Sequence, residues 1–198
     1  MPFPDKEIWA GLAILLMTVA YIPYFYFIFK GCVRPHAFSW LIFFIQTFIA
    51  FLVQCATKAG IGAWPTLLSA LICLAVCIAG FRTGKKDIHR SDYIALLAAL
   101  LALAIWYLTN DPLWSIIIIV IVDTAGYFPT FRKAYAKPHE EGFLTFLLMG
   151  ISNTFMTLAV ENPTLTNVLF PAHMAVLDLG LAGYLLWRRG SLKKKCPA

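Results

Sequence analysis

Tyr21-Ile22-Pro23-Tyr24-Phe25, followed by Arg34-Pro35-His36, is the stretch that decides the fold, because a second copy of it occurs later in the chain. The second copy is Tyr127-Phe128-Pro129-Thr130-Phe131, followed by Lys137-Pro138-His139. A third match comes in the same order, Pro65-Thr66-Leu67 after the first copy and Pro163-Thr164-Leu165 after the second. Twelve positions separate Pro23 from Pro35 and nine separate Pro129 from Pro138, so we interpret the copies as an old duplication with a difference in loop length.

The composition of the chain is typical of a membrane protein. Of its 198 residues, 61% are hydrophobic and 13% are charged, whereas an ordinary globular domain is about half apolar and about a quarter charged. The apolar residues form long uninterrupted runs, which predicts transmembrane helices. The net charge of +6 does not indicate a nucleic-acid partner, because the basic residues lie between the apolar runs. The five cysteines form no disulfide framework, and we expect no metal site and no cofactor.

Seven apolar runs predict seven transmembrane helices, so the fold class we expect is all-α integral membrane. We place the helices at residues 8–29, 38–54, 65–81, 93–108, 113–131, 143–160 and 165–187. The first run is too long for a signal peptide and follows acidic residues, so we expect a retained helix. Pro23 lies inside this run, where a membrane tolerates a kink.

The duplicated segments divide the seven helices into two groups of three with one helix between them. Residues 1–81 form the first three-helix repeat, 82–112 a linker and connector helix, 113–189 the second three-helix repeat, and 190–198 a basic cytoplasmic tail. Three helices followed by one connector return the chain to the side on which it started. We therefore expect a parallel 3+1+3 arrangement, in which both repeats point the same way across the membrane.

The distribution of basic residues predicts the orientation. Of the 16 Lys and Arg residues, all but Lys6 and Lys58 lie in the tail or in the loops after the first, third and fifth helices. Cytoplasmic loops of membrane proteins are enriched in Lys and Arg. We therefore expect the N-terminus outside and the C-terminus in the cytoplasm, in the cell (inner) membrane.

The chain resembles the SWEET and PQ-loop superfamily of seven-helix membrane proteins. In that superfamily a proline near the inner end of the first helix of each repeat precedes a short basic loop, and Pro23 and Pro129 stand in these places. The residues that follow them are Tyr24 and Thr130, where the family motif has glutamine. The run 34–40 resembles an uncharacterised bacterial branch of this fold.

The resemblance implies a small-molecule transporter with a central cavity, working by alternating access with hinges at Pro23 and Pro129. The chain lacks the asparagine pair that sugar-transporting SWEET proteins carry on the third and seventh helices, which argues against a sugar. Intramembrane acids lie in the second repeat, opposite a mostly apolar first repeat. We therefore expect an amphiphilic or cationic cargo, and leave proton coupling open.

Asp123 and Asp178 are the strongest candidate site residues. Asp123 lies eleven residues after Pro112 and Asp178 ten residues before Arg188, so each is about 15–16 Å from a helix end at about 1.5 Å per residue. Both depths are near the middle of a hydrocarbon core about 30 Å thick. No Lys or Arg lies inside any predicted span. We expect each carboxyl to bind a proton or the cargo; the simpler alternative is a protonated acid that links two helices.

Five further residues are candidates with two interpretations each. Asn153 and Gln46 lie deep in predicted helices, where they either line the cavity or hold helices together. His173 either relays protons or bonds the carbonyl group freed by the proline two residues before it, and we favour the carbonyl. Tyr21 and Tyr127 either close the cavity at a cytoplasmic gate or anchor helices at the membrane interface, and we favour the anchor.

An enzyme is not expected, because no metal-ligand spacing and no nucleophile motif occurs. The main alternative to a transporter is a ligand-binding membrane receptor, or a structural membrane protein of PQ-loop type without transport. A carrier accumulates cargo in a sealed vesicle, whereas a receptor saturates. The expected partners are a small solute and membrane lipids, with a homo-oligomer left open.

Overall fold

The computed structural model describes residues 5–31, 37–83, 111–136, 138 and 143–193, and nine residues between 93 and 109. All regular secondary structure in these residues is helical. Half of the expected helix at 93–108 lies outside the described residues, and the eight residues that are described within it are helical. An all-helical architecture is therefore observed, as expected for long apolar runs.

Six α-helices and one short 3₁₀ turn have defined bounds. They are α1 (Lys6–Phe29), α2 (Ala37–Ala56), η1 (Gly60–Gly62), α3 (Ala63–Thr83), α5 (Pro112–Ala136), α6 (Phe143–Ala159) and α7 (Leu165–Lys193). Most ends agree with the sequence prediction to within two residues, but α5 continues to Ala136 instead of ending at Phe131, and α7 continues to Lys193 instead of ending at Trp187. Basic residues are favourable in the last turns of a helix. The extension is also held from outside the helix, because Arg188 Nε donates to the carbonyl oxygen of Tyr135 at 3.1 Å.

Helices α1 to α3 form a first unit and α5 to α7 form a second unit. In the first unit α3 packs along both α1 and α2, and in the second unit α7 packs along both α5 and α6. The two units meet mainly where α1 packs along α6. Buried Ser152 strengthens that contact, because its hydroxyl donates to the carbonyl oxygen of Ala13 at 2.8 Å. The third helix of each unit thus occupies the middle of its unit.

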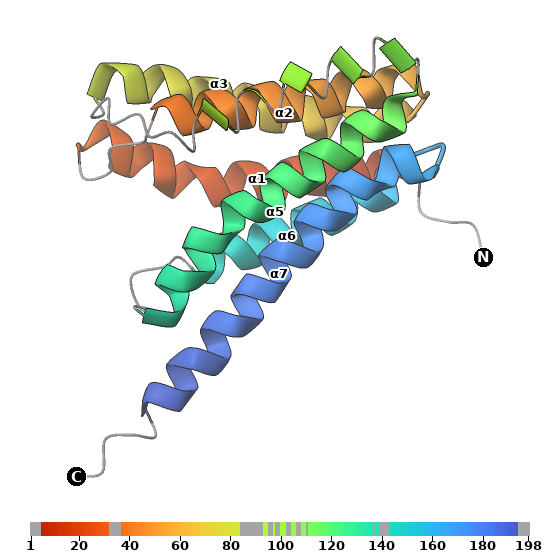
Figure 1. Ribbon diagram of the computed structural model, residues 1–198. Helices are drawn as coiled ribbons and strands as arrows, with labels where there is room; N and C mark the ends of the chain where they lie inside the picture. Colours follow the sequence, from red (N-terminus) through yellow and green to blue (C-terminus); the bar gives the residue numbers. More distant parts are fainter. Residues whose placement is uncertain are drawn as a thin grey trace.

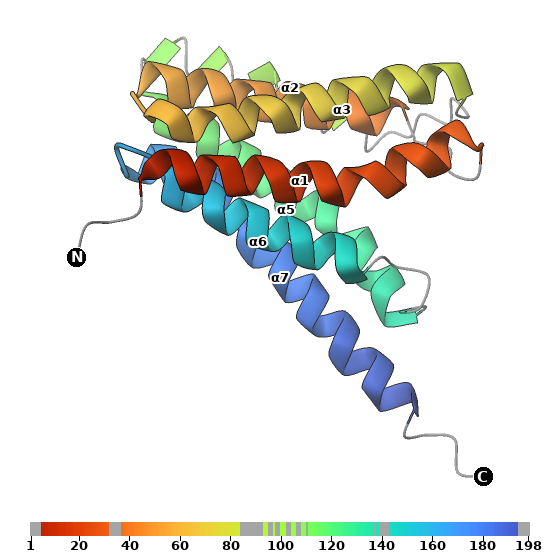
Figure 2. The ribbon, with the colours of Figure 1, turned by 180° about the vertical axis from the view of Figure 1, so that it is seen from behind.

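The direction of the helices is the same in the two units. Helices α1, α3, α5 and α7 all start at the end of the molecule where the N-terminal segment lies, and α2 and α6 start at the opposite end (Figure 1). Seen from behind, the second unit slopes away from the first unit toward the end where α2 begins (Figure 2). Helix α1 bends in its C-terminal half in the same view. That half contains Pro23, which frees a backbone carbonyl and kinks helices.

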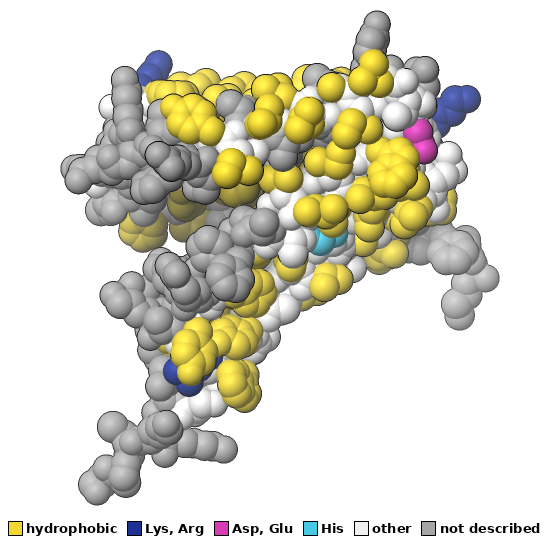
Figure 3. Space-filling model, viewed as in Figure 1, with side chains coloured by type: hydrophobic (Ala, Val, Ile, Leu, Met, Phe, Trp, Pro, Cys, Tyr) yellow, Lys and Arg dark blue, Asp and Glu magenta, His cyan; other side chains and the backbone are white. Residues whose placement is uncertain are grey.

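The outer surface of the described part is apolar. Large side chains such as Leu15, Ile22, Ile121 and Val176 are exposed, and hydrophobic side chains cover the middle of the face shown in Figure 3, with charged side chains at the ends. Lys6–Phe29, Gly60–Arg82 and Leu165–Ser191 are long and apolar enough to cross a membrane. Contiguous apolar surface of this kind indicates contact with lipid or with protein. The described helices therefore fit a helical membrane protein.

The interface between the units has three layers, which can be followed along α2. At the C-terminal end of α2, Gln54 and Thr57 make polar contacts with the second unit. One turn earlier, Ile49, Ala50 and Val53 pack in a dry cluster with residues of α5 and α7. The N-terminal half of α2 lines a cavity at residues 40–47. The cavity is therefore separated from one end of the molecule by an apolar layer and a polar layer.

Candidate functional site

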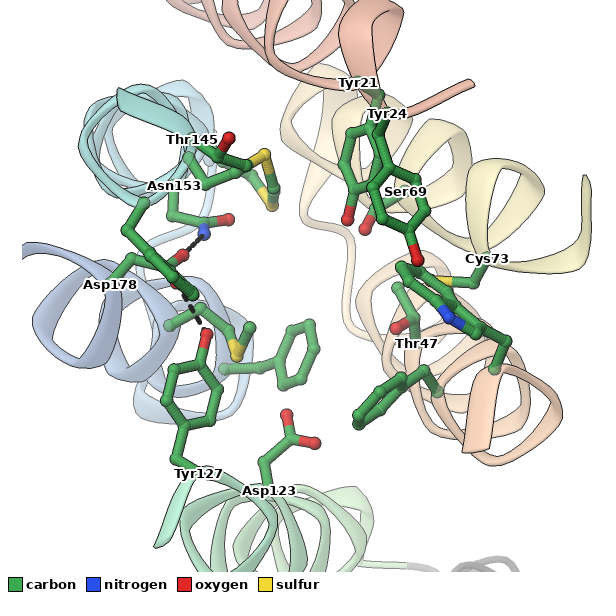
Figure 4. Close-up of a pocket in the computed structure, with 17 residues that line it drawn as sticks. Tyr21, Tyr24, Thr47, Ser69, Cys73, Asp123, Tyr127, Thr145, Asn153 and Asp178 are labelled. Carbon is green, nitrogen blue, oxygen red and sulfur yellow. Dashed lines mark hydrogen bonds between the residues drawn. The ribbon is translucent and has the colours of Figure 1, made fainter. Parts of the chain in front are cut away.

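A cavity of about 360 Å³ lies between the two units. The first unit contributes seven lining residues, all aromatic, hydroxyl-bearing or sulfur-containing: Tyr21, Tyr24, Trp40, Phe43, Thr47, Ser69 and Cys73. The second unit contributes ten, among them every acidic and amide residue of the lining: Asp123, Tyr127, Thr145, Phe146, Met149, Asn153, Met156, Phe170, Met174 and Asp178. Figure 4 shows the two sets facing each other across the cavity. The volume lies near the lower end of the roughly 300–1,000 Å³ typical of small-molecule sites.

Asp178, on α7, is held by two hydrogen bonds from the other helices of its unit. Tyr127 of α5 donates its hydroxyl to Oδ1 at 2.6 Å, and Asn153 of α6 donates Nδ2 to Oδ2 at 2.9 Å. The side chain is 3% exposed. Both carboxyl oxygens are thus engaged, which fixes the orientation of the group (Figure 4). Asp178 therefore ties all three helices of the second unit together at the cavity wall.

Asp123, on α5, lies in the same cavity but in a different state. Its carboxyl group points into the cavity (Figure 4), and the side chain is 6% exposed. No protein hydrogen-bond or ion-pair partner of this carboxyl occurs among the described residues. A buried polar group without a partner costs free energy. The two acids predicted from the sequence thus lie in one cavity, one of them satisfied and the other not.

The two predicted amide residues lie in different surroundings. Asn153 lines the cavity and also bonds Asp178, so both interpretations of it describe the structure. Gln46 is 2% exposed but does not belong to the lining of this cavity. Neither its amide nitrogen nor its amide oxygen has a partner within the described part of the chain. Its place is one turn from Ile49 and Ala50, in the apolar layer of the interface.

His173 does not bond the carbonyl group freed by Pro171, so that expectation was wrong. The freed carbonyl belongs to Asn167, four residues before the proline, and it accepts a hydrogen bond from Gln54 Nε2 at 3.2 Å. His173 Nε2 lies 2.8 Å from Thr124 Oγ1, and the Thr124 hydroxyl donates to the carbonyl oxygen of Val120. The ring nitrogen and the hydroxyl are joined by a hydrogen bond whose direction is set by the histidine tautomer. His173 thus links α7 to α5, away from the residues that line the cavity.

The two predicted gate tyrosines both line the cavity, which corrects the preferred interpretation as interfacial anchors. Tyr127 is committed to Asp178. Tyr21 contacts Tyr24 and Trp40, with ring centroids 6.2 Å and 6.4 Å away, and Tyr24 and Trp40 are 5.7 Å apart. The predicted hinge positions Pro23 and Pro129 both lie within helices, α1 and α5.

Sequence reasoning missed Tyr24 and Trp40 as lining residues. The signal for Tyr24 was its spacing, because residues three apart on a helix share a face and Tyr21 was already a candidate. Trp40 gave no comparable signal, since its position in the cavity depends on how α2 is rotated against α1. The three rings form an aromatic cluster on the wall of the first unit.

A second polar contact between the units, which we call the loop latch, joins residues 54–62 to residues 161–167. Asn167 is fully buried; its Nδ2 donates to the carbonyl oxygen of Thr57 at 3.1 Å, and its Oδ1 accepts the Thr57 hydroxyl. Glu161 Oε1 accepts the backbone N–H of Ile61 at 3.0 Å. A Cβ on Gly62 would lie 2.6 Å from the Cα of Val160, so the two backbones touch here. The sequence signal for this close approach is the pair of glycines at 60 and 62.

Three cysteines lie in the described region, one of them in the cavity wall. Cys55, Cys73 and Cys77 are free thiols, and Cys73 lines the cavity. No group of three His, Cys, Asp or Glu side chains that could hold a metal ion occurs within the described ranges. The arrangement is suited to binding a small molecule through charge, hydrogen bonds and aromatic contact.

Comparisons of this chain with protein-family models, with curated proteins and with solved structures found no match.

Proposed function

We propose that this protein is a small-molecule transporter of the SWEET and PQ-loop type, with seven transmembrane helices in a parallel 3+1+3 arrangement. The common direction of α1 and α5 supports the parallel repeat, as does the central position of α3 and α7 in their units. An additional helix between α3 and α5 is needed to return the chain to the starting side, and helical residues between 93 and 109 support it. Residues 82–112 would then be the connector.

The orientation we propose has the loop latch at the outer side of the cell membrane and the C-terminus in the cytoplasm. Lys30, Arg82 and Arg188 follow or end helices at the opposite side from the latch. An excess of Lys and Arg marks cytoplasmic loops. The latch side holds Lys6 and Lys58 among its basic residues.

One observation above all supports alternating access. The cavity contains buried acids, and contacts between the two units close it at one end. Toward the latch, the apolar layer and the latch itself close the interface. Toward the other end, the second unit slopes away from the first (Figure 2). In a transporter whose two units rock against each other, this slope would correspond to an inward-facing arrangement. Opening the latch would expose the same cavity to the outer side.

The cargo we propose is amphiphilic or cationic. The described part of the lining contains aromatic rings, three methionines and two aspartates, without any Lys, Arg or His. A neutral hexose carries no positive charge that could pair with the two aspartates, whereas a cationic cargo does. Proton coupling would pass through Asp123, since Asp178 is committed to Tyr127 and Asn153.

The test is uptake into proteoliposomes at two pH values, read by mass spectrometry over a mixture of common metabolites. We expect Asp123→Asn to abolish any pH dependence of uptake while the folded yield stays close to that of the unaltered protein. If Asp123→Asn fails to fold, the residue is architectural and the proton site is wrong. Uptake that favours a neutral hexose contradicts the proposed cargo.

The second candidate is a ligand-binding receptor or a structural membrane protein without transport. The observation that favours it is the bonded set of Tyr127, Asn153 and Asp178, which holds the second unit together regardless of any cargo. Saturable binding in detergent without accumulation in sealed vesicles would select this alternative.

A further inference from the structure

Among the residues that the structure describes, the lining of the cavity is acidic and carries no counter-charge. The 17 described lining residues include Asp123 and Asp178 and no basic side chain. Two carboxyl groups in an enclosed, mainly apolar space repel a negatively charged ligand and attract a positive one. The acidic side chains of the lining therefore favour a positively charged ligand.

The two carboxyl groups are not equivalent toward a ligand. Asp178 already accepts one hydrogen bond on each oxygen, from Tyr127 and from Asn153, and these bonds hold it against the wall of the second unit. Asp123 projects into the cavity with no protein partner in the described part of the chain, although it is 94% shielded from solvent (6% exposed). A buried carboxyl group stays ionised only when it is paired and hydrogen-bonded, and otherwise takes up a proton. The missing partner of Asp123 is therefore expected to come with the ligand.

The opposite wall offers aromatic faces. Tyr21, Tyr24 and Trp40 stand on the first unit, and their ring centroids are 5.7–6.4 Å apart. Their planes are inclined to one another by 85°, 72° and 41°, so the cluster presents differently oriented rings. An aromatic face attracts a cation within about 6 Å of its centroid, and sets of such rings recognise quaternary ammonium groups.

We propose that the cavity binds a small organic monocation, with its charged group between the Asp123 carboxylate of the second unit and the Tyr21–Tyr24–Trp40 cluster of the first. Transport of this cation depends on the proposed function. Binding of the cation does not, because a receptor could use the same site. Asp178 acts as a positioning residue that orients Tyr127 and Asn153. One bound cation contacts both units, so its occupancy couples them.

The experiment compares three probes of nearly equal size on the purified full chain in detergent. Choline carries a trimethylammonium group, 3,3-dimethylbutan-1-ol is its uncharged carbon isostere, and glycine betaine adds a carboxylate to the same cation. We expect isothermal titration to give choline at least tenfold tighter binding than the alcohol, with betaine weaker than choline. Equal affinities for choline and the alcohol, or no choline binding by folded protein, overturn the proposal.

Variants of Asp123 and Tyr24 test which side chains contact the bound cation. Asp123→Asn should remove the preference for choline over the alcohol, whereas Glu7→Gln, which neutralises an exposed acid at the start of α1, should leave it unchanged. Tyr24→Phe keeps the ring and should retain choline affinity to within about threefold, and Tyr24→Leu should lose most of it. Equal affinities for Tyr24→Phe and Tyr24→Leu contradict the aromatic contact. A preference that survives in Asp123→Asn contradicts the carboxylate contact.

A transport readout separates the two proposals. Choline binding with the expected preference but without uptake by sealed proteoliposomes leaves the cation site standing and removes the transporter. Uptake of other solutes without any choline preference leaves the transporter standing and removes the cation site.

Discussion

The two ends of the interface between the units use polar side chains in opposite ways. In the loop latch, the polar groups of Thr57 and Asn167 bond across the interface, and the backbones approach so closely that Gly62 has no room for a side chain. In the cavity, Asp123 faces aromatic rings without any bond across the interface among described residues. Polar groups that satisfy each other close an interface, whereas a group left without a partner provides a place for a ligand. The same pair of units therefore holds a seal and a binding site.

The Asp178 and Asp123 pair repeats this contrast within the cavity. Asp178 is satisfied by its own unit and supports structure, whereas Asp123 has no protein partner among the residues that the structure describes. Both are aspartates at similar depth, so residue type and position along the helix do not distinguish them. Only their neighbours do.

The largest effect we expect comes from filling the closest contact in the latch. In Gly62→Ala the new Cβ would lie 2.6 Å from Val160 Cα and 2.9 Å from the Ala159 carbonyl carbon, both backbone atoms that cannot move independently. Overpacking of this kind costs about 3 kcal/mol, which should appear as a lower midpoint of thermal unfolding in detergent. The matched control is Gly183→Ala, which meets nothing within 4 Å. Equal midpoints for the two variants would show that the latch is not a close contact.

A smaller effect should separate the two acids. Asp178→Ala leaves the Tyr127 hydroxyl and the Asn153 amide without their acceptor, and we expect a loss of about 2 kcal/mol in the free energy of unfolding. Asp123→Ala removes a carboxyl that has no protein partner among the described residues, so it should cost nothing or stabilise the fold. Chemical unfolding of both variants in the same detergent is the measurement. The comparison fails if Asp123→Ala is the more destabilised of the two.

The smallest effect concerns two glutamines on α2. Gln54→Leu removes the donor to the Asn167 carbonyl oxygen and should cost about 1 kcal/mol. Gln46→Leu replaces an amide whose two polar atoms are both unpaired within the described part of the chain, so it should be neutral or stabilising. Thermal unfolding of the two variants side by side tests the assignment of Gln54 to the seal. A cost for Gln46→Leu that matches or exceeds that of Gln54→Leu would contradict it.

The sequence alone determined the class of the protein and the course of its helices. Runs of apolar residues and the positions of Pro and Gly act over a few residues, so α1, α2, α3 and α6 begin and end within two residues of their predicted positions, whereas α5 continues five residues beyond its predicted end. The end of α7 was missed by six residues, because its last turns are held by carbonyl groups at the end of α5 and near Pro138. The depth of Asp123 and Asp178 within their helices also followed from the sequence, by counting residues from the helix ends.

The partners of each side chain were decided only by the tertiary structure. Gln54 and Asn167 are 113 residues apart in the chain, and Tyr127 and Asp178 are 51 apart. Whether such groups meet depends on the rotation of each helix about its axis, which the packing of all neighbouring helices sets together. A sequence pattern can place an acid inside a helix bundle, but it does not say whether a neighbouring helix brings it a donor. Neighbouring helices bring two donors to Asp178, whereas Asp123 faces a cavity in the described structure.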